Sequence, residues 1–109
     1  MNGEGWHPVT TTPLAGTAIK IGPAGCSVGP VVIGNLTAAT AWLELFDAAA
    51  AADVTPGTTK PTLTIAVAAS LSKEANLHGL VFKLGLVACS ATAAEGGTGA
   101  NTNTMIGIG

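Results

Sequence analysis

Alternation of apolar with polar or small side chains is clearest between residues 40 and 46. Side chains two positions apart lie on the same face of a β-strand, so this stretch has two distinct faces. One face is aliphatic, and we expect it in the core: Ala41, Leu43 and Leu45. The other face carries aromatic side chains on both sides of a carboxylate: Trp42, Glu44 and Phe46. The pattern predicts a strand whose second, partly apolar face contacts another subunit.

Short runs of the same kind recur along the chain. Residues 62–68 alternate again, with the inward positions expected at Leu63, Ile65 and Val67. Pro30 places the beginning of the run at 28–36 at a sheet edge or a bulge, because proline cannot donate a ladder hydrogen bond. The remaining strands are expected at residues 17–21, 78–83, 84–92 and 104–108.

The segments between these runs carry turn and loop signals. Residues 47–61 form a long connection, and the alanines at 48–52 are too few to hold a helix alone. The sequence Asn35-Leu36-Thr37 is expected to be a turn, because asparagine tolerates left-handed backbone. Residues 70–76 are polar and are expected to be a crossover, and residues 95–103 form a glycine-rich surface loop.

Several short strands separated by turn signals indicate an all-β fold, an antiparallel β-sandwich of Ig-like or jelly-roll-like topology. The chain of 109 residues has room for one such domain, which we place at residues 16–109. Residues 1–15 are expected to be an extended N-terminal arm, because their glycines and prolines oppose both a helix and a central strand. Trp6 and Val9 make this arm apolar enough to dock onto another subunit.

Charge is scarce in this chain, and its scarcity bears on function. Charged residues make up 9% of the sequence, against about a quarter in ordinary globular proteins. A surface with so little charge is poorly protected against association, so we expect much of it to be interface. Direct nucleic-acid binding is not expected, because arginine is absent and the lysines are scattered. The lysines are Lys20, Lys60, Lys73 and Lys83.

The sequence also carries no sign of a membrane protein. The first six residues lack the basic and apolar segments of a signal peptide. Residues 21–43 are uncharged, but glycines and prolines interrupt them, which is unlike a membrane helix. We therefore expect a protein that is made in the cytoplasm and has no membrane partner.

The residues with reactive side chains are few. Cys26 and Cys89 lie in apolar runs and are expected to be buried reduced thiols, because a disulfide would need their strands to be neighbours. His78 is expected at a strand entry with a satisfied ring nitrogen, and no nucleophile motif accompanies it. The acidic residues are expected to be solvated or intersubunit charges: Glu44, Asp47, Asp53, Glu74 and Glu95. No catalytic, cofactor or metal site is predicted.

The order of the segments is itself informative. Residues 30–47 combine a strand, an Asn-x-Thr turn and a second strand that ends in an acidic residue. Residues 62–67, 78–82 and 84–88 follow as further strands, and the last leads into a loop rich in alanine, glycine and threonine. Over about residues 28–100 this order resembles a group of small β proteins encoded beside the capsid genes of tailed bacteriophages, which are described as head decoration, cement or minor virion proteins.

The resemblance implies a homo-oligomer, often a trimer, that sits on a capsid or another part of a virion, with no cofactor and no reaction. We therefore expect a structural virion protein, a decoration or cement protein on the capsid surface, whose partners are itself and the major capsid protein. The residues expected at its interfaces are Trp6, Val9, Trp42 and Phe46. The alternatives are a tail or fibre module of the virion and a carbohydrate-binding or adhesion module.

Overall fold

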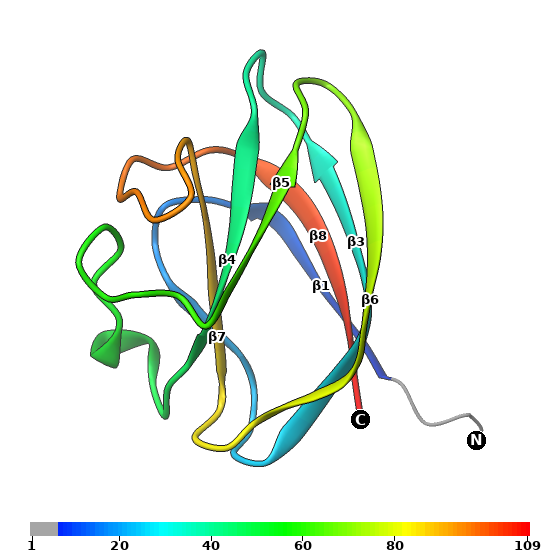
Figure 1. Cartoon of the computed structure of the whole chain (residues 1–109), viewed down its shortest axis with the longest axis vertical. Helices are drawn as coiled ribbons and strands as arrows, with labels where there is room; N and C mark the ends of the chain where they lie inside the picture. The colour runs from blue at the N-terminus through cyan, green and yellow to red at the C-terminus, as the bar shows by residue number, and fades with distance from the viewer. Residues whose placement is uncertain (1–6) are drawn as a thin grey trace.

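The computed structural model describes residues 7–109, which form eight strands and a single 3₁₀ turn (Figure 1). The strands are β1 (His7–Leu14), β2 (Ile19–Gly22), β3 (Cys26–Asn35), β4 (Ala41–Asp47), β5 (Leu63–Val67), β6 (Ser72–Phe82), β7 (Leu86–Ala91) and β8 (Thr102–Ile108). The 3₁₀ turn η1 (Ala51–Asp53) lies in the long connection between β4 and β5. The prediction of an all-β sandwich is confirmed.

The strands form two antiparallel sheets of four, in the orders β1-β8-β3-β6 and β2-β7-β4-β5. The pairs β1·β8, β2·β7, β3·β6 and β4·β5 are nested, as if one long hairpin had been wrapped around a barrel. Eight strands wound in this way make a jelly roll. Of the two topologies that the sequence left open, the structure therefore has the jelly roll and not the Ig-like one.

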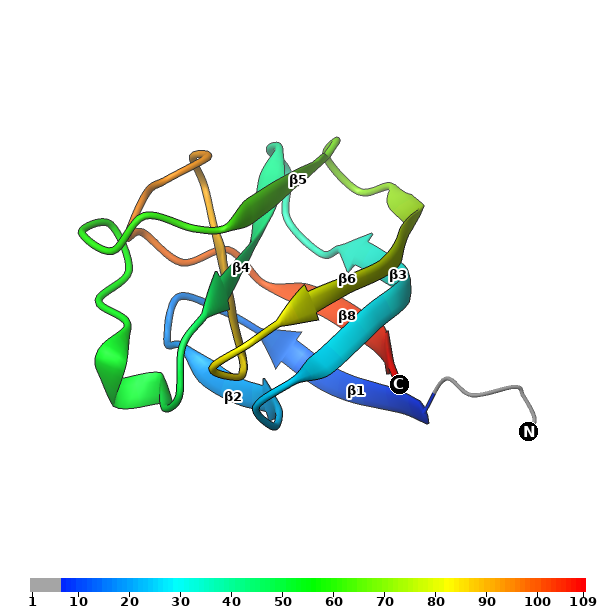
Figure 2. The same ribbon diagram turned by 60° about the horizontal axis from the view of Figure 1, so that its bottom comes forward.

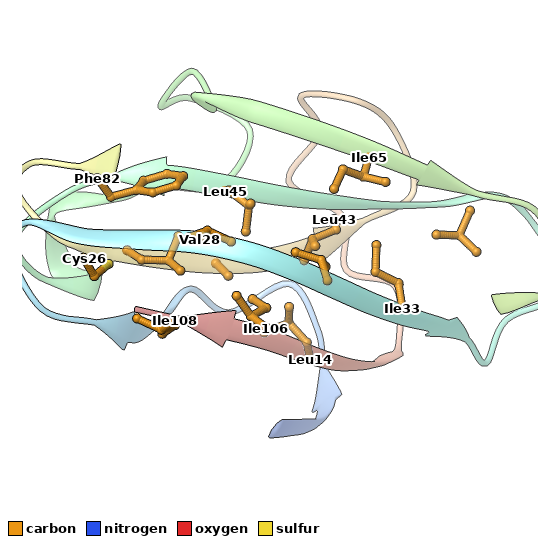
Figure 3. Close-up of a cluster of buried hydrophobic side chains, with 14 residues drawn as sticks. Leu14, Cys26, Val28, Ile33, Leu43, Leu45, Ile65, Phe82, Ile106 and Ile108 are labelled. Atoms are coloured by element: carbon orange, nitrogen blue, oxygen red, sulfur yellow. The ribbon is translucent and has the colours of Figure 1, made fainter. Parts of the chain in front are cut away.

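The core lies between the two sheets and is filled by aliphatic side chains from both (Figure 3). Leu43 and Leu45 of β4 meet Val28 and Ile33 of β3 across the sandwich, and Phe82 closes one end. The inward positions predicted for residues 40–46 are confirmed, since Ala41, Leu43 and Leu45 are fully buried. Those predicted for residues 62–68 are confirmed too, with Ile65 and Val67 buried and Leu63 packed against the cluster.

The N-terminal segment differs from the expected arm in the part that the structure describes. His7–Leu14 forms β1, an edge strand that pairs antiparallel with β8, from His7 opposite Ile108 to Leu14 opposite Thr102. Its prolines are tolerated because one side of an edge strand needs no ladder hydrogen bonds. Residues 7–14 are thus part of the sandwich, and Trp6 lies outside the described residues.

Residues 70–76 are not the crossover that their polarity suggested, since most of them belong to β6. This strand is the edge of its sheet and therefore needs few apolar side chains. Its ladder with β3 shifts register between Val28 and Pro30, which confirms the predicted bulge at Pro30. Opposite this shift His78 and Gly79 both have positive φ, so His78 sits at a mid-strand irregularity and not at a strand entry.

Asn35 organises the turn after β3 through its side chain. Its Nδ2 donates to the carbonyl oxygens of Ala39, Val67 and Ala68, at 2.8 to 3.1 Å. Its Oδ1 accepts hydrogen bonds from the backbone N–H and the hydroxyl of Thr37. The turn was predicted, but its cause is this network and not left-handed backbone at Asn35. The network also ties the end of one sheet to the end of the other.

Candidate interaction surface

Within residues 7–109, no segment packs over the outer face of the β1-β8-β3-β6 sheet (Figure 2). The ladder register aligns Thr10, Met105, Val32 and Glu74 in one row across the four strands. We call this surface the open face. Its outward residues are Pro8, Thr10, Ser27, Pro30, Val32, Gly34, Ser72, Glu74, Asn76, Val81, Asn103, Met105 and Gly107.

The open face is flat and almost uncharged. Glu74, on the edge strand, is the one charged side chain among its described residues. Val81 is 52% exposed, and Val32 and Met105 are half-buried. Gly107 lets Pro30 lie flat against β8, since a Cβ at Gly107 would come within 2.8 Å of the proline ring. A hollow of about 290 Å³ lies between Pro30, Val32, Glu74 and Asn76.

The size of the open face suits a protein contact. Four strands about 4.8 Å apart, each extending for about 25 Å, span roughly 500 Å². Two facing surfaces of this size bury roughly 1,000 Å² together, which is about the lower bound for a specific interface. Because Glu74 is the one charged side chain among the described residues of this face, contact with a partner has a low cost of desolvating charges.

The outer face of the other sheet is covered by the chain itself. Residues 48–61, which carry η1, and residues 92–101 extend over the side of β7 and β4 that points away from the core (Figures 1 and 2). Phe46, Val87 and Cys89 point outward from this sheet and pack against Ala48 and Val54 of the first segment. This second, smaller core buries Phe46 to 2% exposure. We call this surface the covered face.

Glycines join the two covering segments. A Cβ at Gly97 would lie 2.7 Å from the carbonyl oxygen of Pro56, and one at Gly57 would lie 2.9 Å from the nitrogen of Gly97. Gly99 approaches Gly16 in the same way, at 2.6 Å from its nitrogen. These distances are too short for any side chain, so the backbones pack directly against each other. The glycine-rich loop expected at 95–103 is thus a structural part of the cover.

Glu44 lies under this cover and is fully buried. It stands on β4 between Trp42 and Phe46, opposite Thr64 of β5 and Cys89 of β7. The Cys89 thiol donates to Glu44 Oε1 at 3.4 Å, and no described group hydrogen-bonds to Oε2. Glu44 was expected to be a solvated or intersubunit charge; this was wrong, because the covering segments remove it from water within one chain.

Burial raises the pKa of both Glu44 and Cys89. Desolvation raises the pKa of the Glu44 carboxyl above its usual 4.5, the Cys89 thiol partly offsets this, and the nearby charge of Glu95 raises it further. Desolvation and the adjoining Glu44 raise the pKa of Cys89 from 9.0 to about 12. A thiol with such a pKa is a poor nucleophile, since the thiolate is the reactive form. The pair is therefore unsuited to covalent catalysis.

The other acidic and thiol groups have structural places. Asp47 accepts hydrogen bonds from the backbone N–H groups of Lys83 and Leu84 and so holds the turn between β6 and β7. Cys26 and Cys89 are both buried free thiols, as predicted. Within residues 7–109 no three His, Cys, Asp or Glu side chains gather where they could hold a metal ion. None of the described helices is long and apolar enough to span a membrane.

The structure does not bring the four predicted interface residues together. Trp6 is outside the described residues, and Val9 points inward from β1 and packs against the core. Trp42 is half-buried on the covered face, and Phe46 is beneath the cover. Of the three described residues, Trp42 alone remains both large and partly accessible outside the core, and its role in contact stays a prediction.

Sequence reasoning missed the open face. Its signal lies in the run from Pro30 to Gly34, where an inward Val31 and Ile33 alternate with an outward Pro30 and Val32. Apolar residues at both inward and outward positions indicate a strand that is buried on both faces, or one whose outer face needs a partner. The run was predicted to be a strand, but no contact was predicted for its outward residues.

Comparison with known proteins adds little to this geometry. No protein-family model matches the chain, and no curated protein matches it in sequence. Two solved structures of the Tobacco streak virus coat protein are similar in fold. One has 11% identity and a TM-score of 0.43 over 96% of this chain and 85% of that one. The other, a coat protein dimer, has 13% identity and a TM-score of 0.45 over 95% and 85%. Likeness at this level carries no argument about function.

Proposed function

We propose that this protein is a structural subunit of a virion, a decoration or cement protein that stabilises a phage head through contacts between subunits. The observation that carries the proposal is the open face, which is nearly uncharged and is not covered by any described segment of the chain. The same chain uses two segments to cover the opposite face. A surface left open in this way is best explained by a partner that covers it in the assembled particle.

Composition supports a role in assembly. Charged residues total 9% of the sequence, so the surface has few groups that oppose association. The large exposed side chains include Leu36, Leu71, Val81 and Leu84, which lie at the open face and at the turns. We propose that the chain forms a closed homo-oligomer, with three copies as the number that the bacteriophage resemblance implies, and that it binds the major capsid protein on the particle surface.

The fold agrees with this proposal but does not decide it. Jelly rolls occur in viral capsid proteins and also in lectins, so the topology alone is an argument by analogy. A glycan-binding module needs exposed aromatic rings, yet Phe46 and Phe82 are buried and Trp42 is half-buried among the described aromatic residues. No observation on the described residues favours the glycan-binding alternative.

The proposal is tested on virus particles from the source that encodes the chain. Quantitative mass spectrometry of purified particles should find this chain in a fixed ratio to the major capsid protein, at tens to hundreds of copies. Particles made without it should assemble and release their nucleic acid at a lower temperature. Its absence from purified particles would overturn the proposal, and a ratio of only a few copies would move it from the head to the tail or fibre.

A further inference from the structure

The covered face has a feature that the proposed function does not use. Glu44 is a carboxyl group with no exposed surface, placed between two sheet strands and beneath two loops. A buried carboxylate is normally paired with a cation or with several hydrogen-bond donors. Glu44 has a single weak donor, the Cys89 thiol, and its Oε2 has no described partner. Such a site accommodates the neutral acid far better than the anion.

Among the groups around Glu44, the charge of Glu95 raises the pKa of the carboxyl, as desolvation does, and only the weak hydrogen bond from Cys89 lowers it. From β7 it faces Cys89, from β5 it faces Thr64, and from residues 92–101 it feels the charge of Glu95. The other covering segment carries Asp53 and Lys60, which line a hollow next to Phe46 and Asp47. No cation is among the groups that shift the Glu44 pKa. The anion therefore gains stability only if water reaches the carboxylate.

Water can reach Glu44 only if the cover moves. The segment at 48–61 is attached to the face by the small side chains of Ala48, Ala51 and Val54. Residues 92–101 are attached to β7 by the backbone hydrogen bond from Ala100 N–H to Ser90 O, and the hydrogen bond from Thr92 N–H to Thr98 O closes the loop on itself. The two segments meet through the glycine contacts at Gly57 and Gly97. The cover contributes no strand to either sheet, so it can open while the strand pairing of the sandwich stays intact.

We infer that Glu44 is a proton-controlled latch for the cover, which is closed while the carboxyl holds its proton and opens when the proton is released to water. The closed state binds the proton more tightly than the open one. The equilibrium constant for opening then rises by about tenfold for each pH unit, from the ordinary carboxyl pKa up to the pKa of the closed state. This inference is independent of the role in a virion and holds for the isolated chain.

The experiment measures opening through Cys89, which is buried beneath the same cover. In a Cys26→Ala background, the rate at which iodoacetamide alkylates Cys89 is measured from pH 5 to pH 9. Each rate is divided by that of the urea-unfolded chain at the same pH, which removes the ionisation of the thiol itself. The normalised rate should rise with pH by about tenfold per unit over part of this range and then level off.

Matched variants decide the outcome. Glu44→Gln keeps the shape and cannot ionise, so its normalised rate should be low and independent of pH. Glu95→Gln removes a repelling charge and should lower the pKa of Glu44 in the closed state, so the normalised rate should reach its plateau at a lower pH than in the parent. Glu74→Gln, on the open face, should behave as the parent. A pH dependence that persists in Glu44→Gln, or a parent whose normalised rate is flat, would overturn the inference.

A second readout keeps the test valid if Glu44→Gln folds poorly. Hydrogen exchange of residues 48–61 and 92–101, corrected for the intrinsic rate at each pH, should lose protection in the same pH interval. Residues of β3 and β8 should keep their protection from exchange over the whole pH range. Equal loss in both regions would indicate global unfolding and would contradict a latch confined to the cover.

Discussion

The two outer faces of this sandwich are built on sheets of four strands each but are completed in different ways. The β2-β7-β4-β5 sheet carries Phe46, Val87, Cys89 and Glu44 outward, and the chain covers them with residues 48–61 and 92–101. The outward side chains of the β1-β8-β3-β6 sheet are uncharged apart from Glu74, and no described segment covers them. We infer from this difference that the covered face is completed when one chain folds, whereas the open face is completed when the chain associates with a partner.

The test with the largest expected effect truncates one side chain on each face. Phe46→Ala should lower the free energy of unfolding by about 3–5 kcal/mol, because it removes the centre of the smaller core. Met105→Ala should change it by less than about 1 kcal/mol, because its side chain is only half-buried on the open face. Urea unfolding of the two variants measures both values. Equal losses would contradict the division of roles between the faces.

The second test adds one methyl group to a glycine on each side. Gly97→Ala places a Cβ 2.7 Å from the Pro56 carbonyl oxygen and should cost about 1–3 kcal/mol of stability, because backbone must move. Gly34→Ala on the open face meets its nearest atom, the carbonyl oxygen of Asn103, at 3.7 Å, which is an ordinary contact.

The Gly34→Ala variant should therefore keep or gain up to about 0.5 kcal/mol, since alanine loses less backbone entropy than glycine in a strand. Thermal unfolding of both variants provides the measurement. A Gly97→Ala protein as stable as the parent would show that the covering segments are not packed as closely as described.

The third test uses pH and concerns the covered face alone. The pKa of Glu44 is raised in the folded state, so the unfolded chain binds fewer protons above about pH 4.5. Stability should be highest below that pH and fall by up to about 1.4 kcal/mol per unit as pH rises toward the folded pKa. A second loss should follow between pH 9 and about 12, where Cys89 ionises in the unfolded chain first.

Urea unfolding across the pH range checks these losses against two variants. Glu44→Gln should abolish the first loss, and Cys89→Ala should reduce the second, to which Cys26 also contributes because burial raises its pKa. If the stability of the parent and of Glu44→Gln changed with pH in parallel, the ionisation of the buried carboxyl would not be coupled to folding, which would contradict this prediction.

Much of the fold could be predicted from local patterns. The alternation at residues 40–46 and 62–68 identified the core faces of β4 and β5, because a strand of a sandwich places every second side chain in the core between the sheets. The first half of β6 was missed, because an edge strand is half exposed and its polar residues resemble a loop, whereas its second half overlaps the strand predicted at residues 78–83. The nested pairing that makes a jelly roll depends on contacts between distant strands, so local patterns left two topologies open.

The sites were less predictable, for a related reason. Whether Glu44 and Phe46 face solvent depends on segments that begin at residues 48 and 92, and no spacing on β4 reports their position. The glycines at 57, 97 and 99 were the available signal, since clustered glycines permit backbones to touch. The outward residues Pro30 and Val32 were the corresponding signal for the open face.

The central claim is that the open face is an interface, and the native mass of the purified chain tests it most directly. Light scattering on a sizing column at micromolar concentration should give a closed oligomer, and Val32→Lys should give a folded monomer, because a buried unpaired cation is costly at a contact. Leu36→Lys, at the turn after β3, is the matched control and should keep the oligomer. A parent chain that is monomeric throughout, or an oligomer that Val32→Lys leaves intact, would contradict the account.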